Sequence, residues 1–342
     1  MLFTPIEFRD VQARNRLMMS AMCQYIADDG FANDWHPTHY ASRAVGQAGF
    51  ISLEMTAVHP LGRITPGCLG IWKDEHVPGL RGIARACQQH GAKVGVQLGH
   101  AGRKGEFFDQ GLVGPSPIAF ADKWPAPRAL TQAEVGELVD SYAQAARRAN
   151  EAGFDYIELH AAHGYLINQF TSPLANQRDD GYGSDRLRFL REVLQALREV
   201  WPRHKPIFMK VSTIERDEGG AQQAEVVARV AGLREYVDLV IASSGAMAPT
   251  SGIRFDAFPG YQVPFAEAIR REAGVPSAAV GMLDHPLLAE EVLKNGRADV
   301  VAVGRQFLRD PYYPLHAARV LGVEIAWPKP YEKARKDWKY LV

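Results

Sequence analysis

Two imidazoles and a phenol lie within six residues near the middle of the chain. His160, His163 and Tyr165 follow the apolar run 154–159, which predicts a buried β-strand. In an ideal strand His163 and Tyr165 would share one face, and His160 would lie on the other. Gly164 allows the backbone to leave strand geometry, so we expect the three side chains to converge where the strand ends.

These residue types suit catalysis or polar binding. Two neutral imidazoles can donate hydrogen bonds to one carbonyl oxygen, and a tyrosine with a pKa of about 10 can deliver a proton to a basic carbon. The two histidines could instead ligate a metal ion, or they could belong to the packed core. From these residues alone, all three interpretations stay open.

The composition predicts a globular protein without a charged macromolecular partner. The 342 residues are 46% hydrophobic and 23% charged, and 39 basic residues balance 39 acidic ones. A nucleic acid or an anionic membrane would favour a basic excess, so we expect neither as a partner. No apolar stretch is long enough to span a membrane.

The cysteines and the N-terminus indicate the compartment. The three cysteines, Cys23, Cys68 and Cys87, form no Cys-x-x-Cys pair and leave an odd count. This pattern argues against a disulfide framework and a cysteine-ligated cluster, and it fits a reducing cytoplasm. Residues 1–5 lack the basic and apolar segments of a secretory signal. We therefore expect a cytoplasmic protein.

Short apolar runs alternate with amphipathic runs along the whole chain. The apolar runs predict eight strands, over 17–22, 50–58, 93–99, 156–161, 207–212, 237–243, 276–281 and 299–303. The amphipathic runs predict helices over 38–46, 77–90, 132–152, 186–200, 221–234, 264–273, 286–294 and 313–320. Thr131 and Glu134 have the spacing of a capping box, which marks the start of the third helix.

Eight β-α units in one chain favour a single-domain (β/α)8 TIM barrel over a doubly wound sheet. The Gly- and Pro-rich stretch 101–130 is expected to be a lid-like excursion, and a C-terminal tail begins at about 325.

In such a barrel the site lies at the carboxyl ends of the strands. Gly281 and Gly304 end the seventh and eighth strands, where glycine lets backbone N–H groups approach an anion. Arg305 adds a charged fork, so the three together predict a phosphate site, although each glycine alone could be a plain turn. Lys210 lies on the fifth strand and Gln97 on the third.

With these residues assembled, the chain resembles the old yellow enzyme family of FMN-dependent ene-reductases, in particular its bacterial thermophilic-like branch. The motifs that carry the resemblance are RNR (14–16), MCQY (22–25), GRIT (62–65), QLGHAGRK (97–104), HAAHGYL (160–166), FPGYQV (258–263) and VGR (303–305). They are long and run in order along nearly the whole chain.

The resemblance implies a bound FMN over the mouth of the barrel, with its phosphate held by Gly304, Arg305 and the region of Gly281. It also implies that the flavin ring is lined by Ser20, Ala21, Met22, Cys23, Ala57 and Gln97, with Lys210 beside the pyrimidine. NADPH or NADH would reduce the flavin, and a homodimer or homotetramer is expected.

The reaction that the resemblance implies is reduction of an activated alkene. His160 and His163 would hold the carbonyl or nitro oxygen of the alkene, and Tyr25 would contact the substrate. Hydride from the reduced flavin would reach the β-carbon, while Tyr165 would protonate the α-carbon.

The chain departs from the family pattern at several positions. Lys210 replaces the usual arginine beside the flavin, so the charge is kept but the bidentate fork is lost. Ala21 replaces a proline, which loosens the loop after the first strand. Lys333 replaces the arginine that many branch members present to a neighbouring subunit.

Three rival interpretations follow from the same residues. Lys210 at a strand end could be the Schiff-base nucleophile of a barrel lyase or aldolase. His160 and His163 could serve a metal-dependent hydrolase, although the strand ends lack the further ligands expected, so no metal is predicted. The chain could also be a flavin-binding redox sensor or scaffold that has lost turnover.

Overall fold

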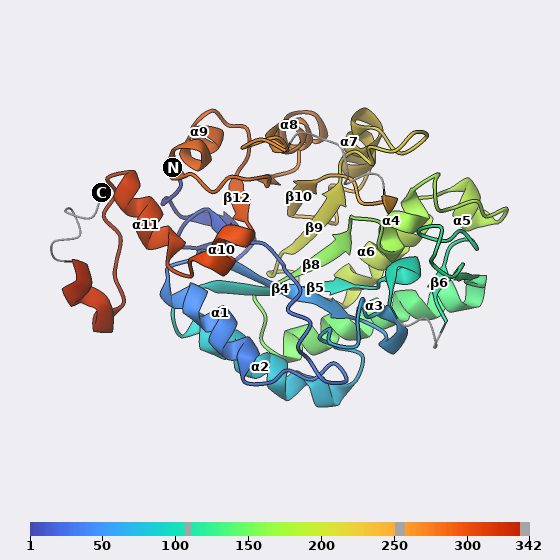
Figure 1. Cartoon of the computed structure of the whole chain (residues 1–342), viewed down its shortest axis with the longest axis horizontal. Helices are drawn as coiled ribbons and strands as arrows, with labels where there is room; N and C mark the ends of the chain where they lie inside the picture. Colours follow the sequence, from blue (N-terminus) through green and yellow to red (C-terminus); the bar gives the residue numbers. More distant parts are fainter. Residues whose placement is uncertain (107–110, 250–256, 336–342) are drawn as a thin grey trace.

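The computed structural model describes residues 1–106, 111–249 and 257–335. Eight parallel strands close into a barrel in the order β10-β11-β12-β3-β4-β5-β8-β9. Figure 1 shows the barrel strands at the centre and the helices around them. The predicted (β/α)8 barrel is thus confirmed.

All eight predicted strands are present; three have the predicted bounds, and the other five differ at one or both ends. The barrel strands are β3 (Leu17–Met19), β4 (Phe50–Ala57), β5 (Lys93–Gly99), β8 (Tyr156–Ala161), β9 (Ile207–Ser212), β10 (Leu239–Ser243), β11 (Ser277–Ala279) and β12 (Val300–Val303). The prediction for the first strand was three residues too long, because after Ser20 bonds to Val303 the chain turns to line a cavity. The seventh strand stops short of Gly281, whose φ of +108° is incompatible with a strand.

The predicted helices are also found. They are α1 (Trp35–Val45), α2 (Val77–Gln88), α3 (Gln132–Glu151), α6 (Arg188–Val200), α7 (Gln223–Gly232), α8 (Val263–Ala268), α9 (Pro286–Lys294) and α11 (Tyr313–Val320). The expected helix 264–273 changes into a π-helical turn, η5 (Ile269–Ala273). Three short helices were not predicted: α4 (Leu166–Thr171), α5 (Gly181–Ser184) and α10 (Arg305–Arg309).

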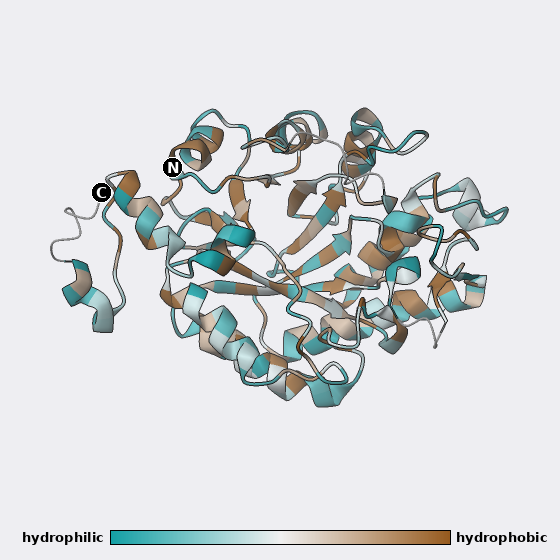
Figure 2. Ribbon diagram, in the orientation of Figure 1, coloured by the Kyte–Doolittle hydropathy of each residue, from teal (hydrophilic) through white to brown (hydrophobic). Residues whose placement is uncertain are grey.

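The helices bury one side against the barrel. In α6 the buried residues are Phe189, Leu190, Val193, Leu194 and Leu197, which recur at the period of a helix. At the start of α3 the Thr131 side chain accepts from the Glu134 N–H and the Glu134 side chain accepts from the Thr131 N–H, so the predicted capping box is confirmed. Figure 2 shows mostly hydrophobic strands at the centre, with hydrophilic residues on the surrounding helices.

The amino end of the barrel is closed by a hairpin that the sequence did not indicate. Strands β1 (Ile6–Phe8) and β2 (Val11–Ala13) pair antiparallel. The Phe8 ring packs on Phe50 and Phe208 inside the barrel, with ring centroids 6.0 and 5.2 Å away. Together with Tyr156 these side chains belong to a buried cluster that fills this end.

The excursion over 101–130 contains a 3-10 turn, η3 (Gly102–Lys104), and two short paired strands, β6 (Val113–Gly114) and β7 (Arg128–Ala129). Further 3-10 turns are η1 (Pro60–Gly62), η2 (Asp74–His76) and, in the C-terminal tail, η6 (Lys329–Arg335). Part of the excursion, 107–110, and the end of the tail, 336–342, lie outside the described residues. Among the helices described, none is both long and apolar enough to cross a lipid bilayer.

Candidate active site

The turn after β8 brings His160, His163 and Tyr165 together, as the sequence predicts. His163 and Gly164 both adopt left-handed backbone conformations, with φ of +57° and +71°. The centroid of the His160 ring lies 5.5 Å from that of His163 and 4.8 Å from that of Tyr165. A Cβ atom on Gly164 would come within 2.5 Å of the Ala246 carbonyl oxygen, so the turn requires glycine here.

Hydrogen bonds to the rings favour particular tautomers. The Ala162 N–H donates to Nδ1 of His160 at 3.3 Å, which leaves the proton on Nε2. His163 Nε2 lies 2.7 Å from Ser243 Oγ. The Ser243 hydroxyl can donate its one proton either to Gln262 Oε1, 3.4 Å away, or to His163 Nε2, and in the second case the proton of His163 is on Nδ1. Neither His160 Nε2 nor His163 Nδ1 has a hydrogen bond in the described part of the chain, so both are available to a ligand.

Both imidazoles are held neutral. Burial holds the pKa of His160 well below its usual value, and His163, Lys210 and Lys104 add to the effect. Burial, followed by the same two lysines, lowers the pKa of His163 in the same direction. A neutral imidazole can donate one hydrogen bond and keep a lone pair on its other nitrogen.

Tyr165 is held protonated. Burial is the main cause that raises the pKa of its phenol, and the neighbouring Cys23, Cys68 and Glu106 raise it further. Lys104 lies with its ammonium 5.0 Å from the centroid of the Tyr165 ring. The ammonium also donates to the carbonyl oxygens of His163 and Ala246, and so fixes the turn against the loop after β10.

Lys210 lies beside the histidines, since it is the register partner of His160 on the neighbouring strand β9. Its buried ammonium donates to Ser20 Oγ at 3.2 Å. Burial lowers the pKa of Lys210, and Glu158 opposes that change. An ammonium has three donor hydrogens, and one of them is used here among the described residues. The buried cation can therefore donate to an anion or a carbonyl oxygen of a ligand.

Below His160 on β8 lies Glu158, which the sequence analysis missed. Its carboxylate accepts from the Gln97 side-chain amide and from Ser52 Oγ, each at 2.6 Å. Ser52 Oγ in turn lies 3.0 Å from the Tyr156 hydroxyl. An acidic residue two positions before His160 in a buried strand must share its inward face, and that signal could have identified Glu158.

A cavity of about 450 Å³ opens next to Lys210 at the carboxyl ends of β3, β11 and β12. Seven predicted residues line it: Ser20, Ala21, Met22, Lys210, Gly281, Gly304 and Arg305. Tyr261, Gln262, Asp284 and Arg309 also line it and were not predicted as site residues. The first two belong to the FPGYQV motif, which was a usable signal.

The cavity fits the FMN that the resemblance implies. Its volume is in the range of small-molecule pockets. The Lys210 ammonium lines the cavity and can donate hydrogen bonds to a polar edge of the flavin ring. Arg305 also lines the cavity and is exposed. A Cβ atom on Gly281 would come within 3.2 Å of the Gln262 and Tyr261 side chains, so glycine is needed for the chain to pass closely beside them.

The other predicted residues lie around the mouth. Tyr25 is half exposed with φ of +55°, and Cys23 and Tyr165 are partly buried against a small cluster at the mouth. Ala57 is the last residue of β4 and is fully buried. Gln97 is buried on β5 and turns its amide to Glu158, so its expected contact with a flavin edge would use its remaining polar atoms.

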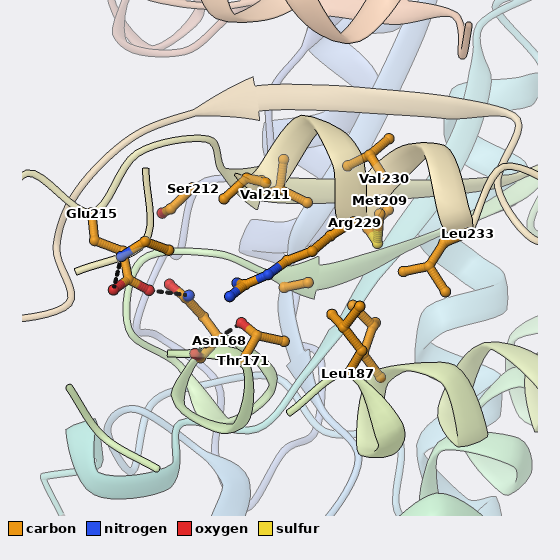
Figure 3. Close-up of a pocket in the computed structure, with 14 residues that line it drawn as sticks. Asn168, Thr171, Leu187, Met209, Val211, Ser212, Glu215, Arg229, Val230 and Leu233 are labelled. Carbon is orange, nitrogen blue, oxygen red and sulfur yellow. Dashed lines mark hydrogen bonds between the residues drawn. The ribbon is translucent and has the colours of Figure 1, made fainter. Parts of the chain in front are cut away.

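A hydrogen-bond network between the barrel and its outer helices supports the turn at His163. A small cavity of about 30 Å³ lies between β9 and the helices α4, α6 and α7. Figure 3 shows Glu215 and Asn168 among the residues that line it. Glu215 accepts from the Asn168 amide at 3.1 Å and from Ser172 Oγ at 2.8 Å. Asn168 Oδ1 accepts from the Gly164 N–H at 2.9 Å. Neither Glu215 nor Asn168 was predicted, because they act through tertiary contacts.

The metal interpretation finds no support in the geometry. Within 1–106, 111–249 and 257–335, no three His, Cys, Asp or Glu side chains are placed to hold one metal ion.

Comparisons with known proteins agree with this geometry. The family model described as NADH:flavin oxidoreductase / NADH oxidase family matches residues 1–322. An NADPH dehydrogenase of Geobacillus thermodenitrificans (strain NG80-2) is 47% identical over 345 residues, which is 99% of each chain.

Solved structures give the same result. A structure of morphinone reductase matches with a TM-score of 0.81 and 26% identity, covering 96% of this chain and 91% of that one. An old yellow enzyme homologue of Zymomonas mobilis matches with a TM-score of 0.80 and 26% identity over 95% and 94% of the two chains. The chain therefore belongs to the NADH:flavin oxidoreductase / NADH oxidase family, the FMN-dependent oxidoreductases of the old yellow enzyme type.

Proposed function

We propose that this protein reduces the C=C bond of electron-poor alkenes, such as α,β-unsaturated carbonyl or nitro compounds, with NADPH or NADH as the reductant. The observation that carries the proposal is the convergence of two neutral imidazoles and one protonated phenol beside the cavity that fits FMN. When bound, FMN accepts hydride from the nicotinamide and supplies it to the alkene.

His160 and His163 bind the oxygen of the substrate. Nε2–H of His160 and Nδ1–H of His163 donate to it, and they stabilise the negative charge that grows on this oxygen as hydride adds to the β-carbon. Their lowered pKa values keep both rings neutral, so each ring donates one hydrogen bond and carries no charge of its own.

Tyr165 delivers the proton. Its phenol stays protonated in the buried site, and the α-carbon becomes basic once the β-carbon has accepted hydride. Tyr25, half exposed at the mouth, contacts the substrate as it enters.

Lys210, Gly304 and Arg305 hold the cofactor. Lys210 supplies positive charge beside the flavin ring, and the two residues after β12 hold the phosphate, together with the turn at Gly281. Lys210 is a point charge and lacks the two-pronged donor geometry of the arginine that is usual in the family. We therefore expect it to orient the flavin less strictly than an arginine would, but to stabilise negative charge on the flavin to a similar extent.

The assembly and setting belong to the same proposal. We infer a single-domain protein that works as a homodimer or homotetramer in the cytoplasm. The balanced charge, with 39 basic and 39 acidic residues, favours small-molecule partners.

The test is an anaerobic visible spectrum of the purified protein, followed by NADPH and then 2-cyclohexen-1-one. We expect a flavin band near about 450 nm that NADPH bleaches and the enone restores. The Tyr165→Phe variant should still bleach with NADPH but should recover far more slowly with the enone, because general acid catalysis contributes roughly 10²–10⁴-fold.

Each contrary outcome points to a different rival. A colourless protein that FMN cannot reconstitute would overturn the flavin assignment, and irreversible trapping of Lys210 by borohydride with a carbonyl compound would then indicate an aldolase. A protein that bleaches with NADPH and ignores the enone would keep the cofactor and contradict the proposed substrate class.

A further inference from the structure

Two of the three cysteines meet at the mouth of the barrel. Cys23 follows β3, and Cys68 lies in the loop after η1. The two thiols lie close enough together to influence each other's ionisation. Cys68 is buried in the small cluster with Met55, and Cys23 packs against that cluster from the side of the mouth.

The backbones that carry the two cysteines are pressed together. The Ala27 N–H donates to the Gly67 carbonyl at 2.9 Å. A Cβ atom on Gly67 would come within 2.4 Å of the Tyr25 carbonyl oxygen, so the segments touch without an intervening side chain. The fold therefore holds the two cysteine-bearing segments against each other.

The environment makes the two thiols unequal. The neighbouring Cys23 thiol is the main cause that lowers the pKa of Cys68 to about 7, and Thr65 N–H, 3.5 Å from the Cys68 sulfur, acts in the same direction. The neighbouring Cys68 thiol and burial raise the pKa of Cys23. Cys87, buried in α2, has its pKa raised to about 12 by burial. A thiolate is the nucleophile in cysteine oxidation, so the lowered pKa favours Cys68 as the attacking thiol, and the raised pKa of Cys87 disfavours its reaction.

We propose that Cys23 and Cys68 form an oxidation site, at which hydrogen peroxide converts the two thiols into an intramolecular disulfide. The Cys68 thiolate attacks one peroxide oxygen, the O–O bond breaks, and a sulfenic acid and hydroxide form. The Cys23 sulfur then attacks the Cys68 sulfur, the S–O bond breaks, and the disulfide forms. In sum two thiols are oxidised by two electrons, and one peroxide is reduced to two water molecules.

Cys68 itself is buried, so the peroxide would reach its sulfur from the mouth, past the partly exposed Cys23. The product would tie the segment of Cys23 and Tyr25 to the loop after η1 and would remove a free thiol from the site. This inference goes beyond the proposed function, because it concerns a covalent state of the chain and its test does not use an alkene.

The test uses the reduced holoprotein, treated with one equivalent of hydrogen peroxide, alkylated after denaturation and digested with trypsin under non-reducing conditions. The cysteines fall in three separate tryptic peptides, 17–43, 64–73 and 86–93. We expect a cross-linked species of peptides 17–43 and 64–73 that dithiothreitol separates, with Cys87 still alkylated. Wild-type protein suffices for this measurement.

Two variants define the order of events. Cys23→Ser should leave a Cys68 sulfenic acid that dimedone labels, and Cys68→Ser should slow oxidation of Cys23 at least tenfold. Cys87→Ser is the matched control and should form the cross-link as the wild type does. Retention of all three thiols, equal oxidation of Cys87, or a disulfide between two chains on a non-reducing gel would each overturn the proposal.

Discussion

The two ends of the barrel are built from the same strands but differ in the side chains that fill them. On β8 and β9, Tyr156 and Phe208 fill the amino end, whereas His160 and Lys210 lie at the carboxyl end. On β8 one inward position, that of Glu158, separates Tyr156 from His160, and on β9 Phe208 and Lys210 occupy successive inward positions. The amino end is closed by ring packing, and the carboxyl end holds buried polar groups with few partners.

The comparison indicates where stability and chemistry reside. At the amino end the ring centroids of Phe8, Phe50, Tyr156 and Phe208 lie 4.5 to 6.0 Å apart. At the carboxyl end, burial lowers the pKa of the histidines and of Lys210, which means that their charged forms are disfavoured. We infer that packing of the rings at the amino end stabilises the strands. Burial of His160, His163 and Lys210 at the carboxyl end costs folding free energy but leaves these side chains available to a ligand.

The largest effect is expected from emptying the aromatic end. Phe208→Ala should lower the free energy of unfolding by about 3–5 kcal/mol, because it removes a buried ring that contacts three others. Denaturant unfolding measures this loss. Phe258→Ala, at a ring that is 60% exposed, is the matched control and should change stability by less than about 0.5 kcal/mol. Equal losses in both variants would contradict the role of the aromatic end.

Substitutions at the carboxyl end should change the rate of the reaction. His160→Ala removes one of the two proposed donors to the substrate oxygen and should slow the enone half-reaction by roughly 10²–10³-fold, about 2.7–4 kcal/mol. Reduction of the flavin by NADPH should change much less, because the proposed hydrogen bond from His160 is made to the oxygen of the alkene substrate. Stopped-flow measurement of the two half-reactions separates these effects, and an equal slowing of both would argue that His160 only supports the cofactor.

The sequence predicted the barrel strands because they are continuous apolar runs between helices, a pattern that is set locally. The hairpin β1–β2 was missed because each strand has three residues and depends on Phe8 docking onto Phe50 and Phe208, a long-range contact. The helix α4 was missed because it is also short: six residues are too few to show a helical period.

At the site, residue types were more predictable than their partners. Gly164 in a polar motif indicated the convergence of His160, His163 and Tyr165, and the geometry confirms it. Glu54 was not predicted, because its contacts with Tyr40 and the Gln24 N–H form only in the folded chain. Glu158 was overlooked although its position two residues before His160 was a usable signal; its partners Gln97 and Ser52 could not be predicted.

A pH-dependent loss of stability is expected from a buried carboxyl group on β4. Glu54, at a register shift in β4, is buried with Tyr40, the Gln24 N–H and His36 around it. Burial raises the pKa of Glu54 from 4.5 to about 8, so between these values the folded chain holds a proton that the unfolded chain releases. Stability from this group is therefore lost as the pH rises, by about 2 kcal/mol between pH 6 and pH 7.5.

Glu54→Gln isolates this contribution. The amide keeps an acceptor for the Gln24 N–H but does not titrate, so the difference in unfolding free energy between the two proteins should shift in favour of the variant as the pH rises. Taking the difference cancels the opposite trend of the buried histidines, which both proteins share. A difference that stays constant between pH 6 and pH 7.5 would show that Glu54 is already ionised in the fold.

The smallest effect should come from a site that belongs to neither end. Thr131 caps α3 on the outside of the barrel, where its hydroxyl accepts from the Glu134 N–H at 3.2 Å. Thr131→Ala should lower the free energy of unfolding by about 1 kcal/mol, because one N–H at the helix start loses its acceptor. Thr131→Ser keeps the acceptor and should restore most of this loss. Neither variant should alter the enone half-reaction, since α3 contributes no residue to the mouth cavity that fits FMN. If loss of this cap slowed that reaction as His160→Ala does, the outer helices would be positioning the site, and the division of labour between the two ends would be wrong.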